Sequence, residues 1–168
     1  MLIRAERSSD IPDIQAVVDA AFVGDNGRAA ESVLIERLRG GAAWLPQLAL
    51  VADDDDQIVG QCLCTRAHVG DTPVLALGPI SVVPGRQGAG IGTALLLTSI
   101  DIALDMSESL IGLVGDYDYY RKFGFVSGSS VGVGSPEPSW GDYFQVKILD
   151  GRRAPQGLFH YPTPFMEM

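Results

Sequence analysis

One short segment limits the folds open to this chain more than any other feature: an apolar strand, a turn with three alternating glycines and an apolar helix follow one another. Residues 74–83 have the composition of a buried strand, which Pro84-Gly85 ends. Residues 90–107 show the apolar periodicity of a helix. The segment 86–93 between them reads Arg-Gln-Gly-Ala-Gly-Ile-Gly-Thr. Its glycines permit backbone conformations closed to other residues and leave no Cβ atoms to keep a ligand away from the amides.

The amides of this turn have the properties of an anion-binding site. The first N–H groups of a helix lack partners inside the helix, and the positive end of the helix dipole attracts phosphate. Two other nucleotide motifs do not fit, because a Walker loop needs Gly-Lys-Ser/Thr and a dinucleotide fingerprint needs Gly-x-Gly-x-x-Gly. We therefore predict a cradle for a pyrophosphate group. A tight turn without any ligand is the alternative that the glycines alone leave open.

The remaining elements alternate along the chain and become mostly β towards its end. Residues 2–6 predict a strand, and Ser8, Ser9 and Asp10 precede apolar residues at helical spacing. Further predicted elements are a helix over 31–39, strands over 48–52, 58–69 and 110–114, a short helix over 117–123, and strands around Val131, 143–149 and 157–161. This order predicts an α/β (α+β) fold, with a mixed central sheet and helices on both faces.

Size and charge narrow the choice of partners. The 168 residues suit a single domain over 1–168 with one core, and 46% of them are hydrophobic. The net charge of −9 opposes binding to nucleic acid or to an anionic membrane, since both are polyanions. The sequence has no signal pattern and no apolar run long enough to span a membrane, so we expect a cytoplasmic protein.

Metal chemistry is not expected. Cys62 and Cys64 are two apart in a strand, which leaves too little backbone for an easy disulfide, and we interpret both as reduced. Only His68 and His160 could extend a zinc site, and neither has metal-ligand spacing. The Asp53–Asp56 run lacks the spacing of a calcium loop, and we interpret it as the solvated tip of a hairpin.

Two motifs together resemble the GNAT (N-acetyltransferase) superfamily. The first is Gln-x-x-Gly-x-Gly from Gln87 to Gly92, preceded by the strand Leu-Gly-Pro-Ile-Ser-Val-Val-Pro over 77–84. The second is Tyr-Tyr-Arg-Lys-Phe-Gly-Phe over 119–125, which is similar to the family's aromatic-Tyr-x-x-x-Gly-Phe segment. The resemblance covers essentially the whole chain. Leu-Gly-Pro and the later Gly-Asp-x-x-Tyr-Tyr also look similar to the YhbS-like subgroup of predicted acetyltransferases.

The resemblance implies a GNAT-like sheet of about seven strands, whose two parallel central strands, 74–83 and 110–114, splay apart at the cofactor site. The co-substrate would be acetyl-CoA. Its pantetheine arm would lie along the backbone of Ile80, Ser81, Val82 and Val83. Its pyrophosphate would meet the amides of Gln87, Gly88, Ala89, Gly90, Ile91 and Gly92, with the Thr93 hydroxyl beside them. Because Arg86 is the only cation between Ala67 and Tyr120, backbone dipoles would carry most of this binding.

The reaction that the resemblance implies is transfer of the acetyl group to a primary amine of a small molecule or peptide. Tyr120, four residues before Gly124, stands where the family places a tyrosine that protonates the leaving thiolate. A backbone amide near Val82 would stabilise the oxyanion. No base is assigned, because 74–83 contains no Asp, Glu or His. Asp116 either holds a water or the incoming amine, or caps the short helix that follows it.

Two questions stay open in the sequence. A non-catalytic acyl-CoA-binding or sensing domain would keep the glycine turn without a productive acceptor pocket, and it is the alternative to an enzyme. The C-terminal run 159–165 is aromatic and proline-rich, and it either lies at an interface, as in a homodimer, or covers the acceptor site.

Overall fold

The computed structural model describes residues 1–23 and 27–168. The strands are β1 (Leu2–Ala5), β2 (Trp44–Asp54), β3 (Gln57–Val69), β4 (Thr72–Val82), β5 (Leu110–Val114), β6 (Val126–Ser127), β7 (Val133–Gly134), β8 (Phe144–Ile148) and β9 (Gly157–His160). The helices are α1 (Ile11–Phe22), α2 (Ala30–Arg39), α3 (Ile91–Asp105), α4 (Tyr117–Tyr120) and α5 (Thr163–Met166). Strands and helices therefore alternate in the middle of the chain, as predicted.

Seven strands follow one another across the sheet in the order β1-β2-β3-β4-β5-β8-β6. Neighbours on this path are antiparallel except β4 and β5, which are parallel. The short strand β9 pairs with the far end of β3, and β7 pairs with β9. The predicted mixed sheet of about seven strands is confirmed, with β7 and β9 as additions to it.

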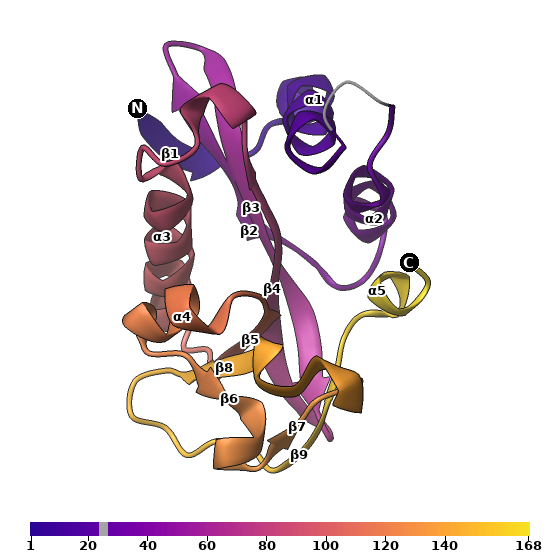
Figure 1. Ribbon diagram of the computed structural model, residues 1–168, viewed down its shortest axis with the longest axis vertical. Helices are drawn as coiled ribbons and strands as arrows, with labels where there is room; N and C mark the ends of the chain where they lie inside the picture. The colour runs from indigo at the N-terminus through magenta and orange to yellow at the C-terminus, as the bar shows by residue number, and fades with distance from the viewer. Residues whose placement is uncertain (24–26) are drawn as a thin grey trace.

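Helices cover both faces of this sheet. α3 lies against one face, while α1 and α2 lie against the other (Figure 1). The alternation of side chains along a strand supplies a separate core to each layer. In β2, Leu48 and Leu50 belong to the core that includes α3, whereas Ala49 and Val51 belong to the core that includes α1 and α2. Because both faces are covered, β4 and β5 in the middle of the sheet are mainly apolar.

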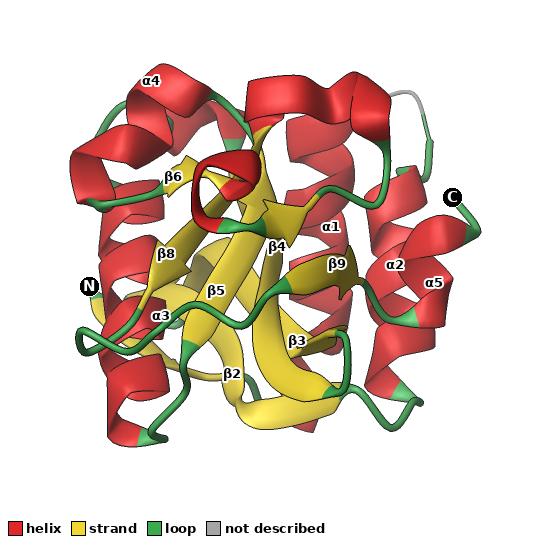
Figure 2. Cartoon of the chain, turned by 90° about the horizontal axis from the view of Figure 1, so that it is seen from below, coloured by secondary structure: helices red, strands yellow, loops and turns green. Residues whose placement is uncertain are grey.

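The C-terminal part of the chain closes one end of the sheet. Phe144 of β8 and Phe159 of β9 are buried and meet edge to face, with ring centroids 5.2 Å apart. Gly112 of β5 lies under the Phe159 ring, where an added Cβ atom would stand 2.5 Å from a ring carbon. Beyond β9 the chain crosses to α5, which lies beside α2 (Figure 2). The last residues of the chain are thereby brought next to its first two helices.

The acidic hairpin is shorter at its tip than predicted. Only Asp55 and Asp56 form the turn, and both have positive φ values, 52° and 65°. Asp53 and Asp54 belong to β2 and face the ladder with β3. A two-residue turn with both φ values positive matches the twist of the strands that it joins, so the strands continue to the edge of the turn.

Other boundaries also differ from the sequence prediction. The strand predicted around Val131 was wrong, because Gly128–Val131 forms a 3-10 turn and the strand begins at Val133, after Gly132 with φ of 82°. The short helix predicted over 117–123 is α4 followed by a 3-10 turn over Arg121–Phe123. These corrections all fall at glycines or at helix ends, where tertiary contacts choose between similar local structures.

Two kinds of feature are absent from residues 1–23 and 27–168. No helix there has the length and apolar character that crossing a membrane requires. No three His, Cys, Asp or Glu side chains within the same residues are grouped in a way that could hold a metal ion. Cys62 and Cys64 are free and buried.

Candidate functional site

The glycine-rich turn connects the end of β4 to the start of α3. A 3-10 turn over Pro84–Arg86 leaves the strand, and α3 begins at Ile91. Gly88 and Gly90 have φ values of 79° and 85°, in the left-handed region that residues with a Cβ atom rarely adopt. Nothing lies within 4 Å of the Cβ position at either residue. The backbone therefore requires both glycines, and the space in front of them is open.

The backbone N–H groups from Gly88 to Thr93 are the donors that this turn offers to a ligand. Among the described residues, no protein acceptor is bonded to the backbone N–H groups of Gly88, Ala89, Gly90, Ile91, Gly92 and Thr93. The next N–H with a protein acceptor is that of Ala94, which donates to Gly90 O at 3.0 Å. The Gln87 N–H is engaged by Pro84 O at 3.4 Å. Consecutive free donors at the positive end of a helix dipole form a site for an anion.

The parallel strands β4 and β5 separate next to this turn. Their register pairs Leu75 with Ile111 and Ala76 with Gly112. Beyond these pairs β5 continues to Val114 against β8, while β4 continues to its end against β3. The predicted splay of the two parallel strands is confirmed, and it leaves one edge of β4 without a strand neighbour over its last residues.

The free edge of β4 presents backbone groups in an alternating pattern. Val83 N–H donates to Val59 O at 3.0 Å, and Ser81 lies opposite Gln61 in the same antiparallel ladder. Bonded and non-bonded pairs alternate in such a ladder. The N–H and C=O groups of Ser81 and Val83 therefore face β3, whereas those of Ile80 and Val82 face the gap.

The side chains around the turn tie it to its neighbours and leave its amides open. Gln87 Nε2 donates to Val82 O at 3.1 Å. Thr93 Oγ1 and Tyr119 OH share a hydrogen bond of 2.7 Å, which joins the start of α3 to α4. Lys122 Nζ lies 5.8 Å from the centre of the Tyr119 ring. Together with the turn, Val82 and Tyr119 line a cleft of about 400 Å³.

Arg86, the cation beside the turn, is held by an ion pair. Its Nη2 atom lies 2.8 Å from Asp54 Oδ2, at the end of β2. The guanidinium holds the pKa of the Asp54 carboxyl below its usual range. Both groups are partly exposed, so water screens the attraction between them. The positive charge of Arg86 is shared with Asp54, and the backbone donors remain the main attraction for an anion.

Tyr120 stands where the gap between β4 and β5 opens. Its ring lies edge to face against Tyr119 and Phe125, with centroids 4.9 Å and 5.8 Å apart. It also covers Gly115, where an added Cβ atom would come within 2.6 Å of the ring. Burial, with a smaller contribution from nearby charges, raises the pKa of the Tyr120 phenol to about 12. The phenol is therefore protonated at neutral pH.

The gap leads into a pocket of about 490 Å³, which we call the Tyr120 pocket. Its lining includes Glu31, Ile80, Leu113, Tyr120, Trp140 and Phe165. These residues come from α2, β4, β5, α4 and the C-terminal part of the chain. Of the C-terminal run, Phe165 and Tyr161 border the pocket, whereas Phe159 is buried in the core. The run therefore forms one wall of the space in front of Tyr120.

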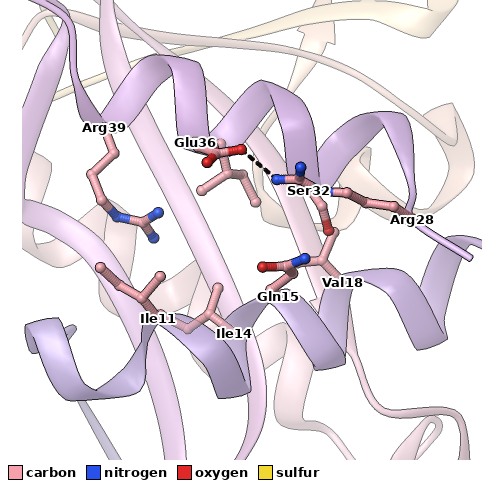
Figure 3. Close-up of a pocket in the computed structure, with 9 residues that line it drawn as sticks. Ile11, Ile14, Gln15, Val18, Arg28, Ser32, Glu36 and Arg39 are labelled. Carbon is pink, nitrogen blue, oxygen red and sulfur yellow. Dashed lines mark hydrogen bonds and ion pairs between the residues drawn. The ribbon is translucent and has the colours of Figure 1, made fainter.

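A further cavity, between α1 and α2, is much smaller (Figure 3). Ile14 and Val18 border it from α1, and the ion pair of Arg28 with Glu36 lies on its α2 side. Its volume of about 50 Å³ has room for no more than a few water molecules. A small-molecule amine does not fit there.

Other candidate residues lie outside the cleft and the Tyr120 pocket. Asp116 is the N-cap of α4, and its Oδ1 accepts from Asp118 N–H at 2.9 Å, so capping is the role that the structure supports among the alternatives left open for it. His68 and His160 are exposed and lie opposite each other where β3 pairs with β9. Neither histidine borders the Tyr120 pocket.

Most of the residues that share a pocket with Tyr120 were not predicted from the sequence. Glu31 reads as an ordinary acidic residue in the first turn of a helix. Trp140 falls in a segment without a predicted element, and Phe22 reads as the apolar end of α1. No local signal identifies them, because only the packing of α1, α2 and the C-terminal part around β4 brings them together.

Comparison with known families and proteins gives matches to acetyltransferases. The model of the acetyltransferase (GNAT) family matches residues 19–125. The uncharacterized N-acetyltransferase YjhQ of Escherichia coli (strain K12) is 33% identical over 121 residues, which make up 70% of this chain and 65% of YjhQ. The match thus spans less than two thirds of the length of that relative.

Two solved structures are similar to this chain over nearly its full length. A GNAT family acetyltransferase from Brucella melitensis, in complex with acetyl-CoA, has a TM-score of 0.79 and 32% identity, with 98% of this chain and 97% of the other covered. The GNAT family N-acetyltransferase YhbS from Escherichia coli, in complex with CoA, has a TM-score of 0.85 and 26% identity, with 98% and 91% covered.

Proposed function

The chain belongs to the acetyltransferase (GNAT) family, and from this premise we propose that it transfers the acetyl group of acetyl-CoA directly to a primary amine of a small molecule or peptide. One observation carries the proposal. The six free N–H groups from Gly88 to Thr93 lie next to an open strand edge and a protonated tyrosine. The diphosphate, the amide-containing arm and the thioester of acetyl-CoA need these three features in this order.

The cofactor is proposed to bind mainly through backbone groups. The pyrophosphate accepts from the free amides between Gly88 and Thr93, with Gln87 at the edge of the cleft. The pantetheine arm adds to the free edge of β4, where the Val82 N–H and the Ile80 C=O face the gap. Ser81 and Val83 hold that edge in place through their bonds to β3. The arm then ends in the gap between β4 and β5.

The proposed reaction begins when a neutral amine attacks the thioester carbonyl carbon. Of the gap-facing amides near Val82, the Ile80 N–H is suited to bind the oxyanion, because Ile80 shares the Tyr120 pocket. As the C–S bond breaks, the Tyr120 hydroxyl protonates the departing thiolate, and the proton that the attacking nitrogen loses restores the phenol. The proton that the amine loses balances the one that the thiol gains. Burial keeps Tyr120 protonated for this role, because its pKa is raised to about 12.

The proposal is tested by binding and turnover together. We expect acetyl-CoA to raise the melting temperature of the protein and a panel of primary amines to release free thiol. Tyr120→Phe should keep the affinity for CoA and lower kcat by a factor of about 10² to 10⁴, the usual contribution of a positioned acid. Tyr117→Phe, which removes a hydroxyl from the same helix outside the Tyr120 pocket, is the matched control and should retain activity.

Three outcomes decide between the alternatives. Failure of acetyl-CoA to bind at millimolar concentration would remove the proposal. Binding without thiol release for any amine would favour a non-catalytic acyl-CoA-binding or sensing domain. Unchanged turnover in Tyr120→Phe would take Tyr120 out of the mechanism and leave the cofactor site standing. The cytoplasmic location, the single domain, the homodimer and the absence of a metal remain predictions.

A further inference from the structure

The walls of the Tyr120 pocket are apolar and largely aromatic. Phe22, Trp140, Tyr161 and Phe165 line it together with aliphatic side chains of β4 and β5. The Tyr161 ring packs against Trp140 and Phe165, with centroids 6.1 Å and 4.8 Å apart. A pocket of this size and lining buries most of the surface of a small organic molecule. The body of the acceptor that fits such walls is itself apolar.

One charged side chain interrupts these walls. Glu31, in the first turn of α2, is the only Asp, Glu, Lys, Arg or His among the lining residues. It is half-buried, and no ion pair or hydrogen bond in residues 1–23 and 27–168 involves its carboxylate. Glu36 of the same helix, by contrast, is exposed and is paired with Arg28. A lone carboxylate on an apolar wall attracts a cation to that wall.

The position of Glu31 is held by the junction of α1 with α2. The Asp19 carboxylate of α1 accepts from Ala29 N–H at 2.8 Å and from Ser32 Oγ–H at 2.5 Å. Because these bonds flank Glu31 on both sides, the first turn of α2 cannot move without breaking them. Glu31 is therefore held at the border of the pocket by a turn that these bonds fix.

We propose that the acceptor is a primary amine carried on a single aromatic body, and that Glu31 binds its ammonium group, which loses one proton to water before the neutral amine attacks. This inference rests on the proposed function. The aromatic side chains of the pocket pack against the ring of the acceptor, and their faces also attract a cation. One carboxylate balances one ammonium group. A polyamine would bring further charges against apolar walls without partners, and leaving them there costs free energy.

Binding of the acceptor can be measured without turnover. Trp140 and Trp44 are the only tryptophans of the chain, so Trp44→Phe makes Trp140 the sole reporter in the pocket. We expect phenethylamine to change the Trp140 fluorescence and spermidine to change it little. Glu31→Gln should raise the Kd for phenethylamine at least about tenfold, as expected when a hydrogen bond between charged groups is lost. Phenethyl alcohol, which has no charge, should bind both proteins equally.

Glu36→Gln is the matched control, because it removes a carboxylate from the same helix outside the Tyr120 pocket. It should leave phenethylamine binding unchanged. Equal binding of phenethylamine to the native protein and to Glu31→Gln overturns the role of Glu31. Tighter binding or faster thiol release with spermidine than with phenethylamine contradicts the proposal that the acceptor is an aromatic amine. Either result leaves acetyl-CoA binding intact, so it is distinguishable from failure of the proposed function.

Discussion

The cleft at the glycine turn and the Tyr120 pocket are neighbours built from different atoms. The cleft offers backbone N–H groups from Gly88 to Thr93, and its one cation, Arg86, is paired with Asp54. The Tyr120 pocket offers side chains, nearly all of them apolar, from segments far apart in the chain. Backbone donors recognise a group common to every acyl-CoA, whereas side chains select one acceptor. The two regions should therefore respond differently to substitution.

The largest expected effect is on the cleft. Gly90→Val forces a β-branched residue into the left-handed region, where Gly90 has φ of 85°. The turn should rotate to relieve the strain and turn its N–H groups away from the pyrophosphate. We expect the Kd for CoA, measured by calorimetry, to rise at least about 100-fold, equivalent to about 2.8 kcal/mol.

Gly85→Ala is the control for this substitution, since Gly85 does not have a positive φ and nothing lies within 4 Å of its Cβ position. It should bind CoA like the native protein. Phenethylamine binding to Gly90→Val, followed by Trp140 fluorescence, should also be unchanged. Loss of both ligands in Gly90→Val would show that the two regions are not independent.

A smaller effect is expected from a change in the pocket wall. Phe165→Ala removes an aromatic side chain that lines the Tyr120 pocket and does not touch the glycine turn. Losing part of this apolar contact should raise the KM for an aromatic amine about tenfold, equivalent to about 1.4 kcal/mol. The Kd for CoA should stay the same. An unchanged KM would mean that the acceptor does not reach the C-terminal wall.

Removing the ion-pair partner of Arg86 is expected to raise the affinity for CoA a few-fold. Asp54→Asn removes the carboxylate that is paired with Arg86 at 2.8 Å. The free guanidinium should then tighten CoA binding by a factor of about two to five, because exposed charge interactions are weak in water. The gain should disappear in high salt. Weaker CoA binding in Asp54→Asn would mean that the ion pair supports the turn instead of competing for its cation.

The smallest expected effect is that of alkaline pH on Tyr120. Its pKa is raised to about 12 from an ordinary value of 10, so the phenol should not ionise below pH 10. The profile of kcat/KM should rise as the acceptor amine loses its proton and show no fall due to Tyr120 in that range. A falling limb below pH 10 that is missing in Tyr120→Phe would contradict this assignment.

The same shift has a consequence for stability. Between pH 10 and pH 12 the folded protein keeps the Tyr120 proton that the unfolded chain has lost. The contribution of this group to stability is therefore complete below pH 10 and is lost as the pH rises through 12. Thermal melting of the native protein and Tyr120→Phe across this range measures the difference.

The glycine turn, the strand before it and the helix after it were predictable because each depends on residues that are close in sequence. Spacing of apolar residues sets the period of an element, and glycines mark positive φ values. The strand predicted around Val131 was wrong for the opposite reason. Val131 and Val133 suit a strand, but the chain forms a 3-10 turn over Gly128–Val131, where Phe144 lies against Gly128 and Gln156 lies against Gly132.

By itself the sequence determined the backbone conformation at Gly88 and Gly90, the amide row at the start of α3 and the presence of Tyr120 beyond the next strand. Only the tertiary structure decided what surrounds Tyr120: the separation of β4 from β5, the aromatic wall from the C-terminal part, and the single carboxylate of Glu31. The physical reason is the separation in sequence between the residues that interact. Backbone geometry follows from steric limits within a few residues, whereas a pocket forms where segments distant in the chain pack against one another.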